Sequence, residues 1–142
     1  MLDYQLVPIY EWGNWFSVRQ IAPEHYDLGD YSGIKLRLRV VSGAEKTLLR
    51  ITLVDINPNS VPYAADELWW CDVQNVLELV SNEWQVVVCP FKSFVLSNGF
   101  GARENDSRLD ISYIVAYEVN IISPEGITVQ GRFELGDLAV YR

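Results

Sequence analysis

Two neighbouring stretches of the chain alternate apolar and polar residues with a period of two. In residues 34–41, "IKLRLRVV", aliphatic and basic residues alternate, and residues 47–55, "TLLRITLVD", continue the pattern with Arg50 and Thr52 on the polar side. Side chains of a β-strand point to opposite faces in turn, so this pattern indicates strands with one buried face. No stretch shows the period of about 3.6 that an amphipathic helix requires. The sequence therefore predicts an all-β protein.

Further segments are rich in β-branched and aromatic residues and are bounded by turn residues. Together with the first two they make eight predicted strands: 4–10, 14–21, 34–41, 47–55, 68–73, 83–91, 112–122 and 132–141. The connecting loops are uneven, and "NPNSVPYAAD" (57–66) is rich in turn residues. Short strands with such loops are typical of an antiparallel β-sandwich, or jelly roll, and residues 1–142 form a single domain.

Charge and composition exclude several classes of partner. The formal net charge of −8 disfavours nucleic acid and anionic membranes, and no apolar run approaches the length of a membrane span. The first residues, "MLDYQLVPIY", show no signal peptide. The cysteines, Cys71 and Cys89, are too few for a disulfide scaffold. We expect free thiols, because alternation predicts that Cys71 points inward and Cys89 outward.

The stretch "ADELWWCDV" (65–73) places two tryptophans side by side between carboxylates. If Val73 closes its strand as a core residue, Trp69 also points inward, and Trp70 and Asp72 point to the other face. The same rule predicts that Trp84 belongs to the core.

Two other strands also place aromatic or polar groups on their outward side. Alternation sends Glu118 and Asn120 outward in one of them and Trp15 outward in the other. An indole beside carboxylates and amides suits a sugar ring, because the C–H face of the ring packs on the indole and its hydroxyls bond to the polar groups.

The order of these motifs resembles the jelly-roll carbohydrate-binding modules, family 11 in particular. The motifs are "DYSGIKLRLRV", "KTLLRITLVD", "ELWWCDV", "NEWQVVVCPFKSF", "LDISYIVAYEVNI" and "GRFELGDLAVY". The related domain of the complex I intermediate-associated protein has similar strands. In family 11 the sugar lies on one concave sheet. The resemblance implies that this sheet holds strands 14–21, 47–55, 68–73 and 113–122, and that the other sheet holds the remaining four.

The resemblance also implies a set of ligand-binding residues. Trp15 falls at a family aromatic position, and Asp66 and Phe100 fall at the rim of the groove. The groove floor would hold Arg50, Trp70, Asp72, Glu118 and Asn120.

Neither a metal nor a catalytic group is expected. Family members hold a structural calcium partly through paired acidic residues near the C-terminus, which are here Gly136 and Asp137, so one ligand is missing. A glycosidase needs two carboxyl groups with separated pKa values, and nothing in the sequence sets Asp66, Glu67, Asp72 or Glu118 apart in this way. No triad or zinc site can be assembled around the single histidine, His25.

The sequence thus favours a non-catalytic module that binds an internal stretch of a polysaccharide, with β-glucan as the expected class. Such a module would be extracellular or periplasmic and tethered to a catalytic or signalling domain. The main alternative is an extracytoplasmic ligand-sensing domain of a membrane-anchored bacterial signalling protein. A third hypothesis, an intracellular assembly factor, would replace the sugar-binding platform with an apolar protein-binding patch.

Overall fold

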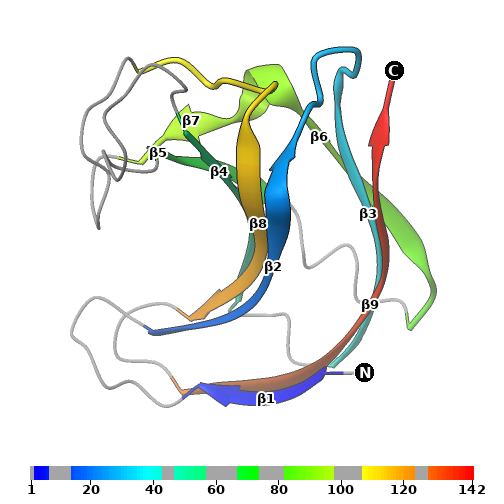
Figure 1. Cartoon of the computed structure of the whole chain (residues 1–142). Helices are drawn as coiled ribbons and strands as arrows, with labels where there is room; N and C mark the ends of the chain where they lie inside the picture. Colours follow the sequence, from blue (N-terminus) through cyan, green and yellow to red (C-terminus); the bar gives the residue numbers. More distant parts are fainter. Residues whose placement is uncertain are drawn as a thin grey trace.

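The chain forms two antiparallel sheets that pack face to face (Figure 1). The structure, a computed structural model, describes residues 2–6, 14–42, 47–56, 67–73, 82–97, 107–123 and 128–142. Its strands are β1 (Leu2–Leu6), β2 (Asn14–Tyr26), β3 (Gly33–Ser42), β4 (Leu48–Asp55), β5 (Glu67–Val73), β6 (Gln85–Pro90), β7 (Val95–Leu96), β8 (Ile114–Ser123) and β9 (Val129–Tyr141). A short 3-10 helix, η2 (Phe91–Ser93), joins β6 to β7.

The strands are divided between the sheets as the sequence predicts. One sheet has the order β1-β9-β3-β6, and the other has the order β2-β8-β4-β5-β7. The two-residue strand β7 is an addition, and it pairs only with Trp69 and Trp70 of β5. The β-sandwich prediction is confirmed.

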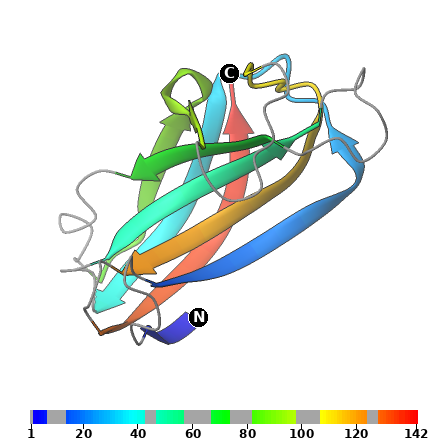
Figure 2. The same ribbon diagram turned by 90° about the vertical axis from the view of Figure 1, so that its left-hand side faces the viewer.

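The five-stranded sheet is curved, and its outward side is concave (Figure 1). Figure 2 is turned so that this side faces the viewer, with β5, β4, β8 and β2 running across it. We call this outward side the concave face.

The core lies between the sheets and follows the period-two pattern closely. Its largest fully buried side chains come mostly from β3 and β4: Ile34, Leu36, Leu38, Val40, Leu49, Ile51 and Leu53. Trp69 of β5 and Phe133 of β9 complete the same cluster. Each large aliphatic side chain buried in this way stabilises the fold by roughly 1.5–3 kcal/mol. Trp69 therefore lies in the core as predicted.

Strand β6 has the opposite orientation to the one predicted. Val86 and Val88 are more than half exposed and Trp84 is 40% exposed, whereas Val87 and Cys89 are buried. The prediction that Trp84 points inward and Cys89 outward is therefore wrong. Three consecutive valines carry no alternation, so the sequence could not set the face of this strand.

The outward position of Trp84 is offset by two basic residues of β3. The guanidinium carbons of Arg37 and Arg39 lie 4.7 and 5.5 Å from the centroid of a Trp84 ring. Such cation–π contacts cover an exposed indole with charges that remain in water. This explains how a large aromatic side chain is tolerated on the outer side of the four-stranded sheet.

Candidate functional site

The concave face carries two rows of side chains that cross four strands in register. The first row runs over Ser17, Asn120, Arg50 and Asp72, and the second runs over Arg19, Glu118, Thr52 and Trp70. In each row, neighbouring residues are direct Cα partners on adjacent strands, so their side chains lie side by side. The structure thus brings together Arg50, Trp70, Asp72, Glu118 and Asn120, which the sequence proposed as one floor.

The centre of the floor is a tight cluster of Arg50, Trp70 and Asp72. The Arg50 guanidinium carbon lies 4.0 Å from the centroid of the Trp70 ring. The same guanidinium donates from Nε to Asp72 Oδ1 at 2.5 Å and from Nη2 to Asp72 Oδ2 at 3.0 Å. This two-bond geometry holds the planar guanidinium parallel to its partner carboxylate and fixes its position over the indole. Trp70 is half-buried, so it is held in place and still presents ring surface to solvent.

Asn120 links three strands below the surface of the floor. Its Nδ2 donates to Thr52 Oγ1 at 2.9 Å, and its Oδ1 accepts from Ser17 Oγ at 2.5 Å. Asn120 and Thr52 are 6% and 3% exposed. A buried amide with both ends bonded holds β2, β8 and β4 in one register.

The two carboxylates of the floor are both paired with arginine. Arg19 Nη1 lies 3.5 Å from Glu118 Oε1, and Asp72 is held by Arg50. The Arg19 side chain is 47% exposed and the Asp72 side chain 42%, so both can reach a ligand. The charges of these two pairs cancel, so the four described ionic side chains of the floor sum to no net charge.

Three predicted residues are not placed by this geometry. Trp15 lies in β2 with its backbone opposite Ile122, one pair along from the Ser17 row. The structure does not describe its side chain. Asp66 and Phe100 lie outside the described residues. Their part in a site stays a prediction.

The candidate set lacked three residues that complete the rows: Ser17, Arg19 and Thr52. Alternation does send all three outward, as it does Asn120 and Arg50. The missing information was the register between strands, which decides that Thr52 lies beside Glu118 and Ser17 beside Asn120. Register depends on long-range pairing and is not visible in one strand.

A second polar cluster lies at the end of β4 and the start of β5. Asp55 and Glu67 are direct partners across these strands, and each is only 2% exposed. Asp55 Oδ2 accepts from the Asp110 backbone N–H at 2.7 Å, and Glu67 Oε1 accepts from the Ser107 N–H at 3.0 Å. Through these hydrogen bonds, the two carboxyl groups hold residues 107–110, which precede β8, against the ends of β4 and β5.

The buried position of Asp55 changes its acidity. Burial raises its pKa from 3.8 to about 7, the Asp110 N–H opposes the rise, and the neighbouring Glu67 adds to it. A carboxyl group with a raised pKa beside a second carboxyl group is also a feature of glycosidases. However, both groups are buried in the fold and bonded to backbone, so the geometry assigns them to structure and not to hydrolysis.

The C-terminal strand does not fit a structural calcium. Gly136 offers no carboxylate, and the Cβ of any larger residue there would lie 3.2 Å from the Trp84 ring. Asp137 is exposed. Within the described ranges, no three His, Cys, Asp or Glu side chains gather as metal ligands would.

The described parts of the chain contain no helix of the length and hydropathy needed to cross a membrane.

The two sheets and the floor define a jelly-roll β-sandwich with a polar and aromatic concave face. Among solved structures, the chain resembles the family 11 carbohydrate-binding module from Clostridium thermocellum in complex with a β-1,3-1,4-mixed-linked tetrasaccharide. The TM-score is 0.63 at 15% identity, covering 89% of this chain and 68% of the other.

Two further solved structures share the fold. The family 11 module of the cellulosomal cellulase Lic26A-Cel5E of the same organism also has a TM-score of 0.63 at 15% identity, covering 89% of this chain and 66% of that one. A family 30 carbohydrate-binding module has a TM-score of 0.57 at 16% identity, covering 97% of this chain and 75% of that one. No family model and no curated protein matches the sequence. The likeness therefore lies in the fold.

Proposed function

We propose that this chain is a non-catalytic module that binds a stretch of polysaccharide along its concave face, with β-glucan as the ligand class. The observation that carries the proposal is the Trp70 indole, held by Arg50 and Asp72 in the middle of a polar floor. A fixed aromatic ring with free surface gives the C–H face of a sugar a place to stack without ordering the side chain first.

The remaining floor residues supply hydrogen bonds. Asp72 and Arg19 are exposed enough to bond sugar hydroxyls, and Glu118 lies beside Arg19 on the adjacent strand β8. Asn120 has both ends of its amide engaged inside the sheet, so its proposed role is to hold the floor in shape. Trp15, Asp66 and Phe100 are proposed as further contacts at the ends and rim.

One property of the floor and one solved structure with this fold support the binding role. Each of its carboxylates is engaged by an arginine of the adjacent strand, an arrangement that positions hydrogen-bonding groups for a ligand. The solved structures with this fold bear on the ligand as well. One of them is a complex with a β-1,3-1,4-mixed-linked tetrasaccharide, and this supports β-glucan as the class to test first.

A module of this kind acts by raising the local concentration of polysaccharide around a linked domain. We propose that the chain functions in an extracellular or periplasmic setting, tethered to a catalytic or signalling domain.

The test is affinity electrophoresis on gels that contain mixed-linkage β-glucan or other neutral polysaccharides. The wild type should be retarded, and Trp70→Ala should migrate as it does on a gel without glycan. The matched control is Trp84→Ala, because Trp84 is also a partly exposed indole under arginine but lies on the opposite sheet.

Trp84→Ala should bind like the wild type. Equal loss in both variants, or no retardation of the folded wild type on any glycan, would overturn the proposal. In the second case a sensor of a small ligand becomes the next hypothesis to test.

A further inference from the structure

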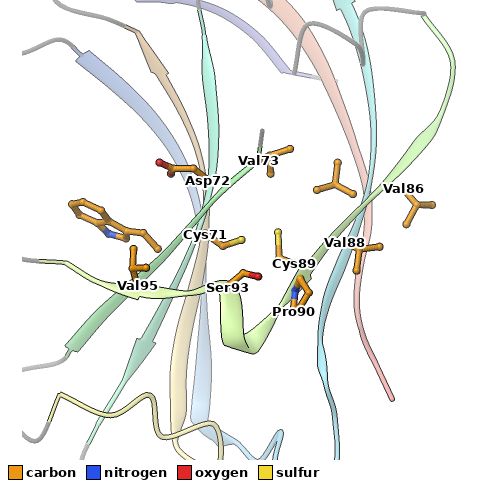
Figure 3. A pocket seen from close by; sticks show the side chains of 11 residues that line it. Cys71, Asp72, Val73, Val86, Val88, Cys89, Pro90, Ser93 and Val95 are labelled. Atoms are coloured by element: carbon orange, nitrogen blue, oxygen red, sulfur yellow. The ribbon is translucent and has the colours of Figure 1, made fainter. Parts of the chain in front are cut away.

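Cys71 and Cys89 face one another from different sheets. Cys71 lies on β5 and Cys89 on β6, and both are free thiols with 7% and 1% exposure. Figure 3 shows their sulfur atoms directed toward each other into the space between the two strands. Cys89 points inward, contrary to the sequence-based prediction. Both thiols therefore lie in the space between the two sheets.

The two strands approach closely at this point. Cα atoms of β5 and β6 come within 8 Å of each other, although they belong to opposite sheets. A disulfide needs Cα atoms about 4.4–6.8 Å apart, and sheets packed face to face are commonly about 10 Å apart. The short connection through η2 to β7, which pairs with β5, draws the two edges together.

Hydrogen bonding between the thiols separates their roles. The hydrogen bond from Cys89 lowers the pKa of Cys71. The same contact, together with burial, raises the pKa of Cys89. Cys71 is the more exposed of the two thiols, so it is the one that meets an oxidant first and attacks, and Cys89 is the resolving thiol.

The thiols are also within reach of a small oxidant. They line a cavity of about 620 Å³ whose other lining residues include Asp72, Val86 and Val95. These three residues are exposed, so within the described part of the chain the cavity lies at the surface, beside the edge where η2 connects β6 to β7. A peptide disulfide can enter such an opening, whereas a fully enclosed thiol pair would be protected.

We propose that Cys71 and Cys89 are a redox pair that closes to a disulfide between the sheets by exchange with a small-molecule disulfide. The Cys71 thiolate attacks one sulfur of glutathione disulfide, forming a mixed disulfide and releasing one glutathione thiolate, which takes up the Cys71 proton. Cys89 then loses its proton and attacks the Cys71 sulfur, which releases the second glutathione. Two electrons and two protons pass from the cysteines to the oxidant.

The bond would join the strand that carries the proposed platform to the opposite sheet. Trp70 and Asp72 flank Cys71 on the other face of β5, and β7 pairs with that strand only at Trp69 and Trp70. Linking residues 71 and 89 removes freedom from the unfolded chain and restrains this part of β5 in the fold. The inference does not depend on glycan binding.

The experiment incubates the folded wild type in buffers of increasing glutathione disulfide to glutathione ratio. We expect both thiols to become unreactive to a thiol reagent and the intact mass to fall by about two hydrogens. A peptide map should join 71 to 89. The melting temperature should rise by on the order of 5–10 °C, and dithiothreitol should reverse every change.

Cys71→Ala is the control, because it leaves Cys89 without a partner, and its melting temperature should not rise under the same oxidation. Two results would overturn the proposal. One is a wild type whose thiols stay reduced until denaturant is added, as expected for cysteines that serve only as small core residues. The other is oxidation that yields only glutathione adducts or disulfide-linked dimers.

Discussion

Arg50 lies 4.0 Å above the Trp70 ring while its guanidinium is bonded twice to Asp72. One arginine thus fixes both the aromatic and the acidic part of the floor. The arrangement joins β4 to β5 on the concave face. If the floor binds sugar, its affinity depends on this arginine even where the arginine itself does not touch the ligand.

Replacing Arg50 tests that dependence. Arg50→Met keeps the length of the side chain but removes the bonds to Asp72, and we expect affinity for β-glucan to fall about tenfold, with a stability loss of about 1 kcal/mol. Isothermal titration and urea unfolding measure the two effects. Arg37→Met, which removes an arginine from Trp84 on the other sheet, is the matched control. An Arg50→Met protein that binds like the wild type would show that the contacts of Arg50 with Trp70 and Asp72 have no part in recognition.

The buried hydroxyl of Thr52 should be needed for the shape of the floor. Thr52→Val leaves the Asn120 amide N–H without its acceptor in a buried site, and we expect a stability loss of about 1–3 kcal/mol in urea unfolding. Thr52→Ser keeps the acceptor and should lose clearly less. A Thr52→Val protein as stable as the wild type, with the loss confined to Thr52→Ser, would mean that the methyl group, and not the hydrogen bond, carries the effect.

Asp55 should make stability depend on pH. Its folded pKa of about 7 lies above the model-compound value of 3.8, so between these values the folded state keeps a proton that the unfolded state has lost. The contribution of Asp55 to stability should therefore be greatest below about pH 4, fall as the pH rises toward 7, and level off above pH 7. The fall should be up to about 1.4 kcal/mol per pH unit.

Asp55→Asn checks this expectation, because the amide resembles the protonated carboxyl at every pH. Urea midpoints measured from pH 4 to 8 should give a flatter profile for the variant and a gain in stability near pH 8. The exposed Asp137→Asn is the control. A variant profile with the same slope as the wild type would assign the pH dependence to other groups, with Glu67 and Asp110 the nearest to examine.

Binding of a neutral glycan should depend little on salt. The charged side chains of the floor form two ion pairs, Arg19 with Glu118 and Arg50 with Asp72. A ligand therefore contacts hydrogen-bonding groups whose opposite charges largely cancel. We expect affinity to change less than about twofold between roughly 0.05 and 0.5 M NaCl, a range over which long-range charge attraction is largely screened. A steep fall with salt would point to a charged ligand.

Alternation along single strands was enough to predict much of this protein. It placed the inner faces of β3, β4 and β5 correctly, and it separated Trp69 in the core from Trp70 on the concave face. It succeeds there because each of these strands has one buried and one solvated face. A shift of the strand by one residue would expose every apolar side chain to water. The jelly-roll sandwich follows from the number and spacing of such strands.

The tertiary structure decided what depends on neighbours. The run Val86–Val88 suits either face equally, and only packing against β3 turned Cys89 inward toward Cys71. Register between strands aligned Thr52 with Glu118 and Asp55 with Glu67, which no single segment encodes. The sequence by itself determined which residues β3, β4 and β5 bury, because that choice is set by local alternation. Pairing across strands and sheets determined which side chains meet, because it balances contacts from the whole chain.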